Sequence, residues 1–564
     1  MTTAAVPKHL IAESLSRARL QIDCDVGPGP GRIPFLSIIE PFVETGSALL
    51  AGRAPGMDRS ISPEASEDLR RSLRLWLATL FTPILAHEFA LFRLDRSGVP
   101  PDLAPANAPP GDTLYRSFCA HLLAGDLHAL LGEYPALPRL AGRCMRDWVE
   151  GARELERRIR RDRRTMSREL AGGRNPGRVV SLRTLSTDRH GGGRTVLLLA
   201  FESGARIVYK PRPVGMELRF REVVEWLAGR PGSGPALRAP RVFDRGSYGW
   251  TELVEPAECP DETAAGRYHY RLGGLLALLH ALGATDCHME NLIAAGDRPV
   301  LVDGETLLYP GGGESPAHGM DGSVLTTGLL PAVRLGESGD VSGVAGGREE
   351  AETEAVVWSA PGTDAMALVP GTAPAPARHN VPTLGGRLLR VEDYRDHVLA
   401  GFSDGYRDLC RHREDLLAGP ITRLGTELVR FLPRATSTYW KLQLSALTPH
   451  ALTSPARRRA RLDRLSLALR NSPEPDHRQP LVEAERRALE RLDIPAFYTR
   501  ADSRDLPLPG GRRITGYFAE SALERAVRRF KALSAEDLAR QTEVVNAALD
   551  RLAAQPCRRL TEGR

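Results

Sequence analysis

The sequence predicts an α+β fold of two lobes that follow a large helical region. Three patterns carry this prediction: helical spacing of apolar residues from about 33 to 170, short β-prone runs from about 178, and a long helical stretch followed by two more short strands. The chain has 564 residues, of which 42% are hydrophobic and 26% are charged, an ordinary balance for a globular protein. Its length allows more than one hydrophobic core.

We place the domain boundaries where these patterns change. Residues 1–32 are weakly patterned and end in "VGPGPGR", which indicates a disordered tail and linker. Residues 33–170 form the helical N-terminal region, 171–260 the smaller, strand-rich lobe and 261–564 the larger lobe. Within the larger lobe, residues 310–381 are rich in Gly, Pro and Ala and have little periodicity, so we expect a long mobile loop there.

Local patterns predict the individual elements. In the helical region, 66–94 and 114–134 have the apolar spacing of amphipathic helices. The smaller lobe contains three β-prone runs, "RVVSLRTLS", "RTVLLLAFE" and "ARIVYKPR", separated by the turn signals "TDRHGGG" and "SG", which predict an antiparallel meander. Helices are expected at 215–229 and 262–283, with the strand "GWTELVEP" between them. The stretch "NLIAAGDRPVLVDGE" predicts two strands around a "GD" turn, and the chain beyond about 390 is mostly helical.

Composition limits the class of function. The net charge of +6 is small for this length, and the most basic run, 156–168, is typical of a solvated helix face, so we expect no nucleic-acid partner. No stretch approaches the roughly 18 apolar residues of a membrane helix, and the N-terminus lacks the layout of a signal peptide. The seven cysteines are scattered singly without a CxxC pair, so we expect neither zinc nor a disulfide scaffold. These features favour a cytoplasmic protein.

The stretch "TDCHMENLIAAGDRPVLVDGETL", residues 285–307, gathers polar residues that ordinary core packing does not require. Asp286 and Asn291 have the D-x-x-x-x-N spacing of a kinase catalytic loop. Asp303 ends a predicted strand, where a metal-binding aspartate would lie, and Glu305 faces the same way in an extended chain. Oxygen ligands of this kind suit Mg²⁺. For each acid taken singly, the alternative is a surface hairpin with acidic turns.

A lysine in the third β-prone run supplies the cation that phosphate chemistry requires. Only four of the 76 basic residues are lysines, so Lys210 in "ARIVYKPR" stands out in a chain that otherwise uses arginine. Its strand lies upstream of the acids, as does the strand of a kinase lysine that contacts nucleotide phosphates. Glu222 or Glu225 on the following helix could orient it. The alternative is a strand-end lysine in solvent.

The turn "TDRHGGGRT", residues 187–195, occupies the place of a glycine-rich loop that covers phosphates. Glycines there let backbone amides approach an anion, and Asp188 and His190 could reach a transferred phosphate. A plain hairpin turn would explain the glycines equally well. The order of strands, lysine, helix, acid loop and metal strand is that of a two-lobed kinase-like fold. It predicts ATP-dependent phosphoryl transfer and leaves the acceptor open between peptides and small molecules.

Longer motifs resemble one family specifically. The stretch "LGATDCHMENLIAAGDRPVLVDGETLLYP" closely resembles the dehydratase domain of class II lanthipeptide synthetases, the LanM family. Further matches run in the family's order over nearly the whole chain: "IPFLSIIEPFV" (33–43), "EYPALPR" (133–139), "DRHGGGRTVLLLAFESGARIVYKPR" (188–212), "YGWTELV" (248–254), "SVLTTGLLP" (323–331), "RFLPRATSTYW" (430–440) and "LERLDIPAF" (489–497).

The resemblance implies an elaborated lipid-kinase-like fold and a two-step reaction. Such enzymes use ATP and Mg²⁺ to phosphorylate Ser and Thr in a precursor peptide, which consists of leader and core. They then eliminate the phosphate to leave dehydroalanine or dehydrobutyrine. For phosphorylation, the resemblance implies Asp286 and His288 as catalytic residues, Lys210 on the ATP phosphates, and Asn291, Asp303 and Glu305 as ligands of the metal and nucleotide.

Elimination requires a further set of residues, which the resemblance also implies. The family's R-x5-T spacing falls on Arg430 and Thr436 in "VRFLPRATSTYW". Arg430 would hold the leaving phosphate bidentately and Thr436 would donate to it. Asp188 and His190 match other family residues associated with this step. Without the resemblance, Arg430 and Thr436 would pass for surface residues.

The sequence departs from full-length family members, which carry a second, zinc-dependent cyclase domain with a Cys, Cys-His-Gly ligand set. No Cys-His-Gly occurs here, so we expect no ring closure by this chain and, for a stand-alone dehydratase, a separate LanC-like cyclase as partner. Two other hypotheses stay open: a kinase of a peptide or small molecule that does not eliminate, and a non-catalytic fragment that holds the leader peptide. The region 33–170 would dock the leader, cap a lobe or only buttress the fold.

Overall fold

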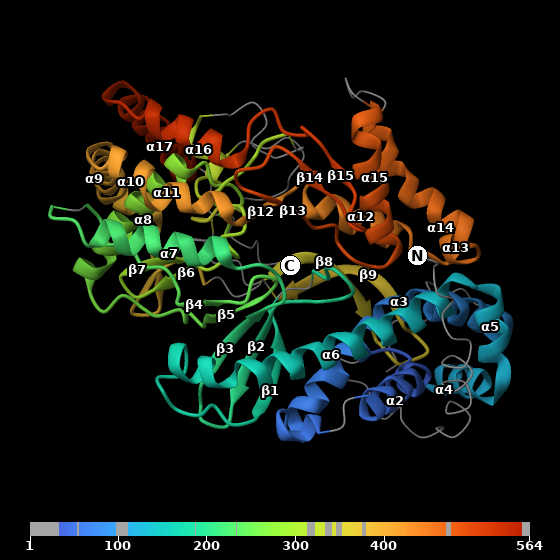
Figure 1. Ribbon diagram of the computed structural model, residues 1–564. Coiled ribbons are helices and arrows are strands. Elements are labelled where there is room, and N and C mark those ends of the chain that lie inside the picture. Colours follow the sequence, from blue (N-terminus) through green and yellow to red (C-terminus); the bar gives the residue numbers. More distant parts are fainter. Residues whose placement is uncertain are drawn as a thin grey trace. The chain divides into compact units, whose positions relative to one another are not determined.

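The computed structural model describes residues 33–53, 56–97, 111–185, 188–232, 234–312, 322–332, 341–345, 352–374, 379–469 and 475–554 (Figure 1). The chain divides into two compact units, each assembled from segments that are far apart in sequence. Unit 1 comprises Met1–Arg206, Glu352–Pro374 and Thr436–Pro495, and unit 2 comprises Ile207–Ala351, Ala375–Ala435 and Ala496–Arg564. Each unit contains buried hydrophobic clusters of its own.

Three long helices form the N-terminal part of unit 1. They are α2 (Leu36–Arg53), α3 (Pro63–Ser97) and α6 (Ala136–Glu169), and each packs against the other two. The sequence of α3 explains the packing, because Leu69, Leu73 and Leu77 recur every fourth residue and are buried on one face. The helical structure predicted for 33–170, and the helix predicted at 66–94, are confirmed by the described residues.

The helix predicted at 114–134 is confirmed with one interruption. α4 (Thr113–His121) and α5 (Leu127–Glu133) are joined by a π-helical turn at Leu122–Asp126. Gly125 lies in this turn with a φ of 152°, a value that glycine adopts without a side-chain clash. Leu123 and Leu127 are both buried, so the apolar face continues across the interruption.

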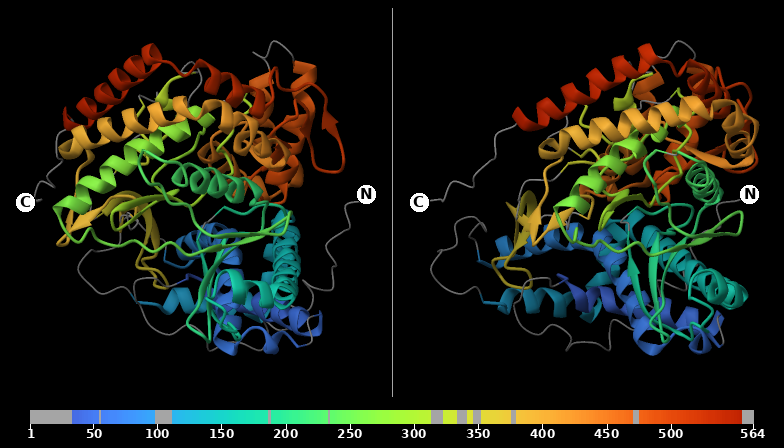
Figure 2. Two further views of the ribbon diagram at one scale, coloured as in Figure 1. Left: turned by 60° about the vertical axis from the view of Figure 1, so that its left-hand side comes forward. Right: turned by 90° about the vertical axis from the view of Figure 1, so that its left-hand side faces the viewer.

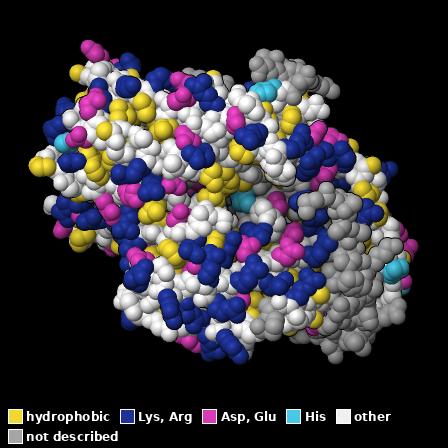
Figure 3. Space-filling model, in the orientation of Figure 1, with side chains coloured by type: hydrophobic (Ala, Val, Ile, Leu, Met, Phe, Trp, Pro, Cys, Tyr) yellow, Lys and Arg dark blue, Asp and Glu magenta, His cyan; other side chains and the backbone are white. Residues whose placement is uncertain are grey.

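The basic run 156–168 lies on α6 and is solvated, as predicted. The Arg160 side chain is 67% exposed, whereas Ile159 and Met166 on another face of the helix are buried. Basic and acidic side chains are interspersed over the face of the protein seen in Figure 3. The run is therefore the polar side of an amphipathic helix.

Among the described residues, α3 is the one helix long and apolar enough to cross a membrane by length and composition alone. Its most apolar window has a mean hydropathy of 1.5 and is 44% buried within the protein. The same helix carries Arg70 and Arg74, which form ion pairs with Glu40 of α2. This helix is a stronger candidate than we expected from the sequence. The absence of a membrane span stays a prediction.

The rest of unit 1 consists of two strand pairs and a group of short helices. The strands β1 (Val179–Thr184) and β2 (Leu197–Phe201) pair antiparallel as predicted. The helices are α12 (Thr436–Ser445), α13 (Pro449–Leu452), α14 (Pro455–Leu462) and α15 (Pro475–Glu490). A small core of Tyr439, Leu462 and Leu489 holds this group together.

The segment 310–381 is not the structureless loop that we expected. It contains an antiparallel hairpin of β8 (Glu352–Ser359) and β9 (Ala367–Pro374), which belongs to unit 1. The turn of this hairpin is anchored by Asp364, whose carboxylate accepts the backbone N–H of Tyr115 at 2.7 Å. The β-branched residues Val356 and Val357 favour a strand, but the Gly, Pro and Ala content around them hid the signal.

Unit 2 opens with the lysine strand. β3 (Arg206–Lys210) and β4 (Val242–Asp244) both pair antiparallel with β5 (Gly249–Glu252), and α7 (Gly215–Ala228) follows β3. Lys210 is the last residue of β3, lies opposite Gly249 and is buried. The strands and the helix predicted here are confirmed.

The helical core of unit 2 is a stack of three helices. α8 (Glu262–Leu282), α9 (Arg395–Arg411) and α17 (Ala535–Ala554) lie in successive layers, as both views of Figure 2 show. The crossing of α8 and α9 requires glycine, because a Cβ on Gly273 would lie 2.1 Å from the carbonyl oxygen of Val398 and one on Gly401 would lie 1.8 Å from that of Tyr270. The two backbones are therefore in direct contact.

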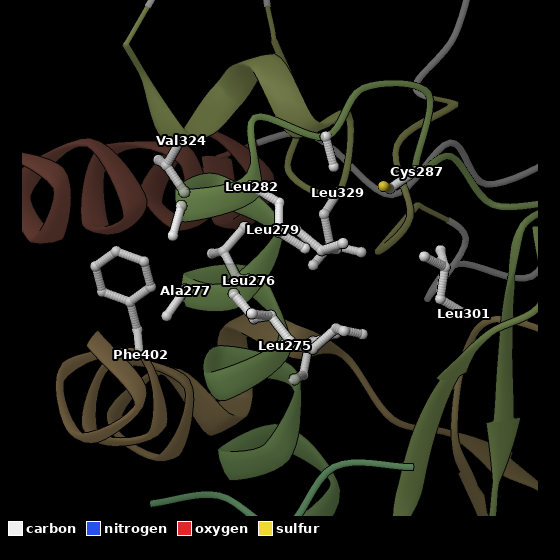
Figure 4. Close-up of a cluster of buried hydrophobic side chains, with 14 of the residues drawn as sticks. Leu275, Leu276, Ala277, Leu279, Leu282, Cys287, Leu301, Val324, Leu329 and Phe402 are labelled. Atoms are coloured by element: carbon white, nitrogen blue, oxygen red, sulfur yellow. The ribbon is translucent and has the colours of Figure 1, made fainter. Parts of the chain in front are cut away.

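The loop that follows α8 rests on this core. Leu279 and Leu282 of α8, Leu329 and the side chain of Cys287 belong to one buried cluster (Figure 4). The smaller elements around it are β6 (Leu292–Ala295) with β7 (Arg298–Leu301), β10 (Thr383–Leu384) with β11 (Arg387–Leu388), α10 (Arg413–Ala418), α11 (Pro420–Arg423), β12 (Leu428–Phe431) with β13 (Phe497–Arg500), β14 (Leu506–Pro507) with β15 (Arg513–Ile514), and α16 (Ala522–Ala532). Both units mix helices with strands, and the two-lobed kinase-like arrangement stays a prediction.

Candidate active site

The loop between α8 and β6 carries three of the predicted site residues and is held by backbone hydrogen bonds. Cys287 donates its N–H to the carbonyl oxygen of Thr327 at 2.9 Å, and Met289 donates to that of Val341 at 3.1 Å. Gly328 allows the close approach, because a Cβ there would lie 3.3 Å from the nitrogen of Cys287. Two described pieces of the 310–381 segment thus fix the loop.

Asp286 occupies a backbone conformation that is uncommon for an L-residue, with a φ of 64°. Asn291 stabilises this turn, because its side-chain nitrogen donates to the Asp286 carbonyl oxygen at 2.8 Å. With that nitrogen engaged, the amide oxygen of Asn291 is the atom available to a cation. Unusual backbone conformations of this kind cluster at functional sites.

His288 lies beside Asp286. Its Nδ1 lies 3.2 Å from the backbone nitrogen of Glu290, and its Nε2 lies 3.4 Å from the side-chain nitrogen of Asn291. That Nε2 lies 3.7 Å from Oδ1 of Asp286. Burial raises the pKa of Asp286 more than the nearby charges of His288 and Arg430 lower it. A carboxylate with a raised pKa is a better proton acceptor.

Asp303 and Glu305 share a cation that we did not predict. The guanidinium of Arg212 contacts Asp303 Oδ1 at 2.7 Å and Glu305 Oε2 at 3.2 Å. The two acids therefore face the same side, as their spacing predicted. Arg212 directly follows the predicted lysine strand, two residues after Lys210.

Lys210 is held by Glu217, and the prediction that Glu222 or Glu225 orients it is wrong. Nζ of Lys210 lies 3.3 Å from Glu217 Oε1 and donates to the carbonyl oxygen of Val302 at 2.6 Å. Glu217 is buried in the first turn of α7, nearest to the strand. Glu222 pairs instead with Arg219 and Glu225 with Arg221, because both acids point away from the lysine.

Arg430 is buried and bound to Glu305, so it is not a surface residue. Its backbone N–H donates to the Glu305 carbonyl oxygen at 2.8 Å, and its Nη1 pairs with the Glu305 carboxylate. Tyr498, opposite Arg430 in the β12–β13 pair, donates its hydroxyl to Glu305 Oε2 at 3.0 Å. The Nε atom of Arg430 is buried and has no hydrogen-bond partner among the residues that the structure describes.

Nearby cations lower the pKa values of Asp303 and Glu305, whereas burial raises the pKa of Asp286. Burial by itself would raise the pKa of Asp303, but Arg212 and Lys210 bring it well below its usual range. The pKa of Glu305 is likewise lowered by Arg212 and Arg430, against the effect of burial. Asp303 and Glu305 are therefore ionised near neutral pH, whereas burial raises the pKa of Asp286 and makes its carboxylate more basic.

The oxygen atoms of Asp303 and Asn291 suit a Mg²⁺ ion that is bound together with a nucleotide. Among the residues described, no group of three or more His, Cys, Asp or Glu side chains is placed to hold a metal by itself. Mg²⁺ is usually held by one or two carboxylates together with substrate phosphates, not by an all-protein cage. Asp303 and the amide oxygen of Asn291 match that use. These residues fit a metal that arrives with a nucleotide.

The remaining predicted residues, Asp188, His190 and Thr436, lie in unit 1. Trp440 donates its indole N–H to Asp188 Oδ1 at 2.8 Å. Thr436 begins α12 four residues before Trp440, on the same face of that helix. His190 is fixed through Nδ1, which lies 2.9 Å from the carbonyl oxygen of Ile494. Asp188 therefore lies beside α12, the helix that begins at Thr436.

The glycine-rich turn does bind an anion, but that anion belongs to the chain. The amides of Gly192 and Gly193 donate to the two carboxylate oxygens of Asp493 at 2.7 and 2.8 Å. The positive φ values of these glycines, 91° and 76°, turn both N–H groups toward the carboxylate. The prediction that these amides approach a nucleotide phosphate is not seen here, because Asp493 occupies them.

Four residues of these sites were missed from the sequence: Arg212, Glu217, Tyr498 and Asp493. Arg212 and Glu217 had a usable signal, because they are charged residues two and seven positions after Lys210. Tyr498 and Asp493 had none, because they join the sites through pairings of segments that are remote in sequence.

Comparison with known proteins identifies the family. Residues 134–500 match the family model described as "Domain of unknown function (DUF4135)", and the chain belongs to this family. The matched range includes every predicted site residue. The resemblance to LanM-type synthetases is thereby confirmed.

One curated relative adds detail. The chain is 21% identical over 394 residues to the "Lacticin 481/lactococcin biosynthesis protein LcnDR2" of Lactococcus lactis subsp. lactis. The similarity covers 66% of this chain but only 41% of that protein, so the chain spans less than half the length of the relative.

Proposed function

We propose that this chain is a lanthipeptide dehydratase. It would phosphorylate Ser and Thr in a precursor peptide with ATP and then eliminate the phosphate to leave dehydroalanine or dehydrobutyrine. Family membership and the similarity to a lacticin 481/lactococcin biosynthesis protein support this proposal. Because ATP is required, the reaction would take place in the cytoplasm, and ring closure would need a cyclase such as a separate LanC-like protein.

In the phosphorylation step, the hydroxyl oxygen of the peptide would bond to the γ-phosphorus of ATP, the bond from that phosphorus to the β–γ bridging oxygen would break, and ADP would leave. Asp286 would accept the proton of the hydroxyl. His288 would fix the Asp286 carboxylate, and Lys210 would hold the nucleotide phosphates as a compact charge. Mg²⁺, held by Asp303, Asn291 and Glu305, would neutralise charge on the transferred phosphoryl group. Asp303 is ionised for this role because Arg212 and Lys210 lower its pKa.

In the elimination step, a base removes the α-proton, the Cα=Cβ bond forms and the Cβ–O bond to phosphate breaks. The departing phosphate needs a fixed cation, and Arg430 is suited to this because its guanidinium can bind two phosphate oxygens. Asp188, His190 and Thr436 are assigned to this step by the family resemblance.

The observation that carries the proposal is the contact between Arg430 and Glu305. It joins the arginine expected for elimination to an acid expected for phosphorylation within one buried cluster of unit 2. A kinase is nevertheless the second candidate, because Lys210, Asp286 and Asn291 suffice for phosphorylation alone.

Mass spectrometry of a precursor peptide encoded beside this protein tests the proposal. After incubation with ATP and Mg²⁺, loss of one water for each modified residue is expected. Gain of phosphate without loss of water would identify a kinase and refute the elimination step. An unchanged peptide in the presence of bound nucleotide would favour a non-catalytic fragment.

A further inference from the structure

The most completely paired side chain of unit 2 is Arg212. Its three nitrogens contact three different carboxylates: Glu217 at 2.9 Å, Asp303 at 2.7 Å and Glu305 at 3.2 Å. The side chain is 12% exposed. Each nitrogen of the planar guanidinium thus faces an acid, and Nη1 also donates to the carbonyl oxygen of Pro213 at 3.0 Å.

This arrangement conflicts with metal binding to the same acids. A divalent cation on Asp303 would lie within a few ångströms of the guanidinium, and like charges at that distance repel strongly in a partly buried site. The carboxylate oxygen that Arg212 contacts, Oδ1 of Asp303, also accepts the backbone N–H of Glu305 at 3.2 Å. Arg212 and a metal therefore compete for one carboxylate.

Glu217 offers Arg212 a second anchor that the metal does not need. Its Oε1 contacts both Lys210 and Arg212, and its Oε2 is buried without a hydrogen-bond partner. A guanidinium that leaves Asp303 can stay attached to Glu217. It would then lie beside Lys210, the cation expected on the nucleotide phosphates.

We infer that Arg212 is a displaceable countercation: it neutralises Asp303 and Glu305 while the metal is absent, and it moves from Asp303 to nucleotide phosphate oxygens when Mg²⁺ takes that carboxylate. The inference rests on the proposed function for the identity of the nucleotide and the metal. It makes Arg212 a positioning residue for the acids in one state and a phosphate ligand in the other.

The two roles give the substitution Arg212→Met effects of opposite sign. Without the guanidinium, Asp303 and Glu305 lose their competitor, so the affinity for a divalent cation in the absence of nucleotide should rise by about tenfold or more. ATP loses a phosphate ligand, so its affinity should fall by about tenfold. A site that had merely collapsed would bind both more weakly.

The experiment uses the full chain and Mn²⁺ as the metal probe. Electron paramagnetic resonance measures Mn²⁺ binding without nucleotide, and calorimetry measures ATP binding in the presence of Mg²⁺. We expect tighter Mn²⁺ binding and weaker ATP binding for R212M than for the wild type. R212K keeps the positive charge but loses the planar guanidinium, so it should be intermediate in both measurements. R219M is the matched control, because Arg219 of α7 pairs with Glu222 and Glu427 and contacts neither Asp303 nor Glu305.

Several results would overturn the inference: unchanged or weaker Mn²⁺ binding by folded R212M, the same change in R219M, or no Mn²⁺ binding by either R212M or the wild type. If R212M does not fold, R212K provides the test. Wild-type affinities of R212K for both Mn²⁺ and ATP would exclude a specific role for the guanidinium. None of these titrations includes a peptide. They can therefore fail while the dehydratase proposal holds, and they can succeed while it fails.

Discussion

Arg430 and Glu305 are joined twice, once through the backbone at 2.8 Å and once through their charged side chains. The double link fixes the position of the arginine relative to the carboxylate without using its Nε atom, which has no hydrogen-bond partner. A second anion such as a phosphate could be bound by the unused part of the guanidinium. This geometry supports the assignment of Arg430 to the elimination step.

Replacement of Arg430 should separate the two steps. In R430M, we expect phosphorylated peptide to accumulate while dehydrated product is lost, because the leaving phosphate has lost its cation. Glu305 would stay buried with one cation fewer, so the free energy of unfolding should fall by about 2–4 kcal/mol. Mass spectrometry and chemical denaturation measure the two effects. R500M is the control, because Arg500 lies on the adjoining strand β13 and pairs with Asp502 at the surface. Dehydration at the wild-type rate by R430M would refute the assignment.

The substitution Asp286→Asn should abolish phosphorylation but not folding. Loss of a proton acceptor typically costs about 10²- to 10⁴-fold in rate, measured here as phosphate transfer to peptide. The pKa of Asp286 is raised in the folded protein, so its ionisation opposes folding as the pH rises through that pKa. D286N should therefore be at least as stable as the wild type at neutral pH, and the difference should shrink toward acid pH. A destabilised D286N would contradict the direction of the pKa shift.

Glu217, and not Glu222 or Glu225, should orient Lys210 for ATP binding. E217Q removes the charge shared by Lys210 and Arg212, and we expect ATP affinity to fall by about tenfold. E222Q and E225Q are matched controls on the same helix and should bind ATP like the wild type. Isothermal calorimetry measures all three. A loss of ATP affinity confined to E222Q or E225Q would instead support the prediction from sequence that one of these acids orients Lys210.

Asp147 in unit 1 should make stability depend on pH. Burial first, and then the charge of Asp493, raise the pKa of Asp147 to about 6, against the influence of Arg143 and Arg189. A carboxyl with a raised folded pKa stabilises the fold below its unfolded pKa, and this contribution is lost as the pH rises toward 6. The free energy of unfolding of D147N should not decrease in this way, so D147N should be more stable than the wild type at pH 7–8 by about 1–3 kcal/mol. Denaturation series at several pH values test this, and parallel curves for D147N and wild type would contradict it.

The contact between Asp493 and the glycine-rich turn can be tested by hydrogen exchange. In D493A the amides of Gly192 and Gly193 lose their acceptor, so their exchange should accelerate by about tenfold or more. D505N is the control, because Asp505 accepts the amide of Gly516 elsewhere in the chain. Protected amides in D493A would mean that another group holds the turn.

Much of unit 2 could be predicted from the sequence because its signals are local. The spacing of Asp286 and Asn291, and the two short strands that lead to Asp303, place these residues without any long-range information. Lys210 was found for a similar reason, because a single lysine is conspicuous in an arginine-rich chain.

The remaining features depend on pairings that no local pattern encodes. Tyr498 contacts Glu305 because β13 pairs with β12. Asp493 accepts the amide of Gly193 although the two residues are 300 positions apart. The acid that holds Lys210 could be narrowed to α7 but not to Glu217, because the orientation of a helix relative to a strand is set by packing. The β8–β9 hairpin was missed because the Gly, Pro and Ala content of 310–381 hid the β-forming residues of β8, such as Val356 and Val357.

The glycine crossing of α8 and α9 limits how the chain can vary. A methyl group at Gly273 or Gly401 would meet a carbonyl oxygen of the facing helix, so no change of neighbouring side chains can make room for it. In a saturation library selected for folding, Gly273 and Gly401 should therefore tolerate no other amino acid. Nearby apolar positions such as Leu276 should accept residues of similar volume. The loop that carries Asp286 is attached to the end of α8, so its placement depends on the absence of a Cβ atom at Gly273 and Gly401.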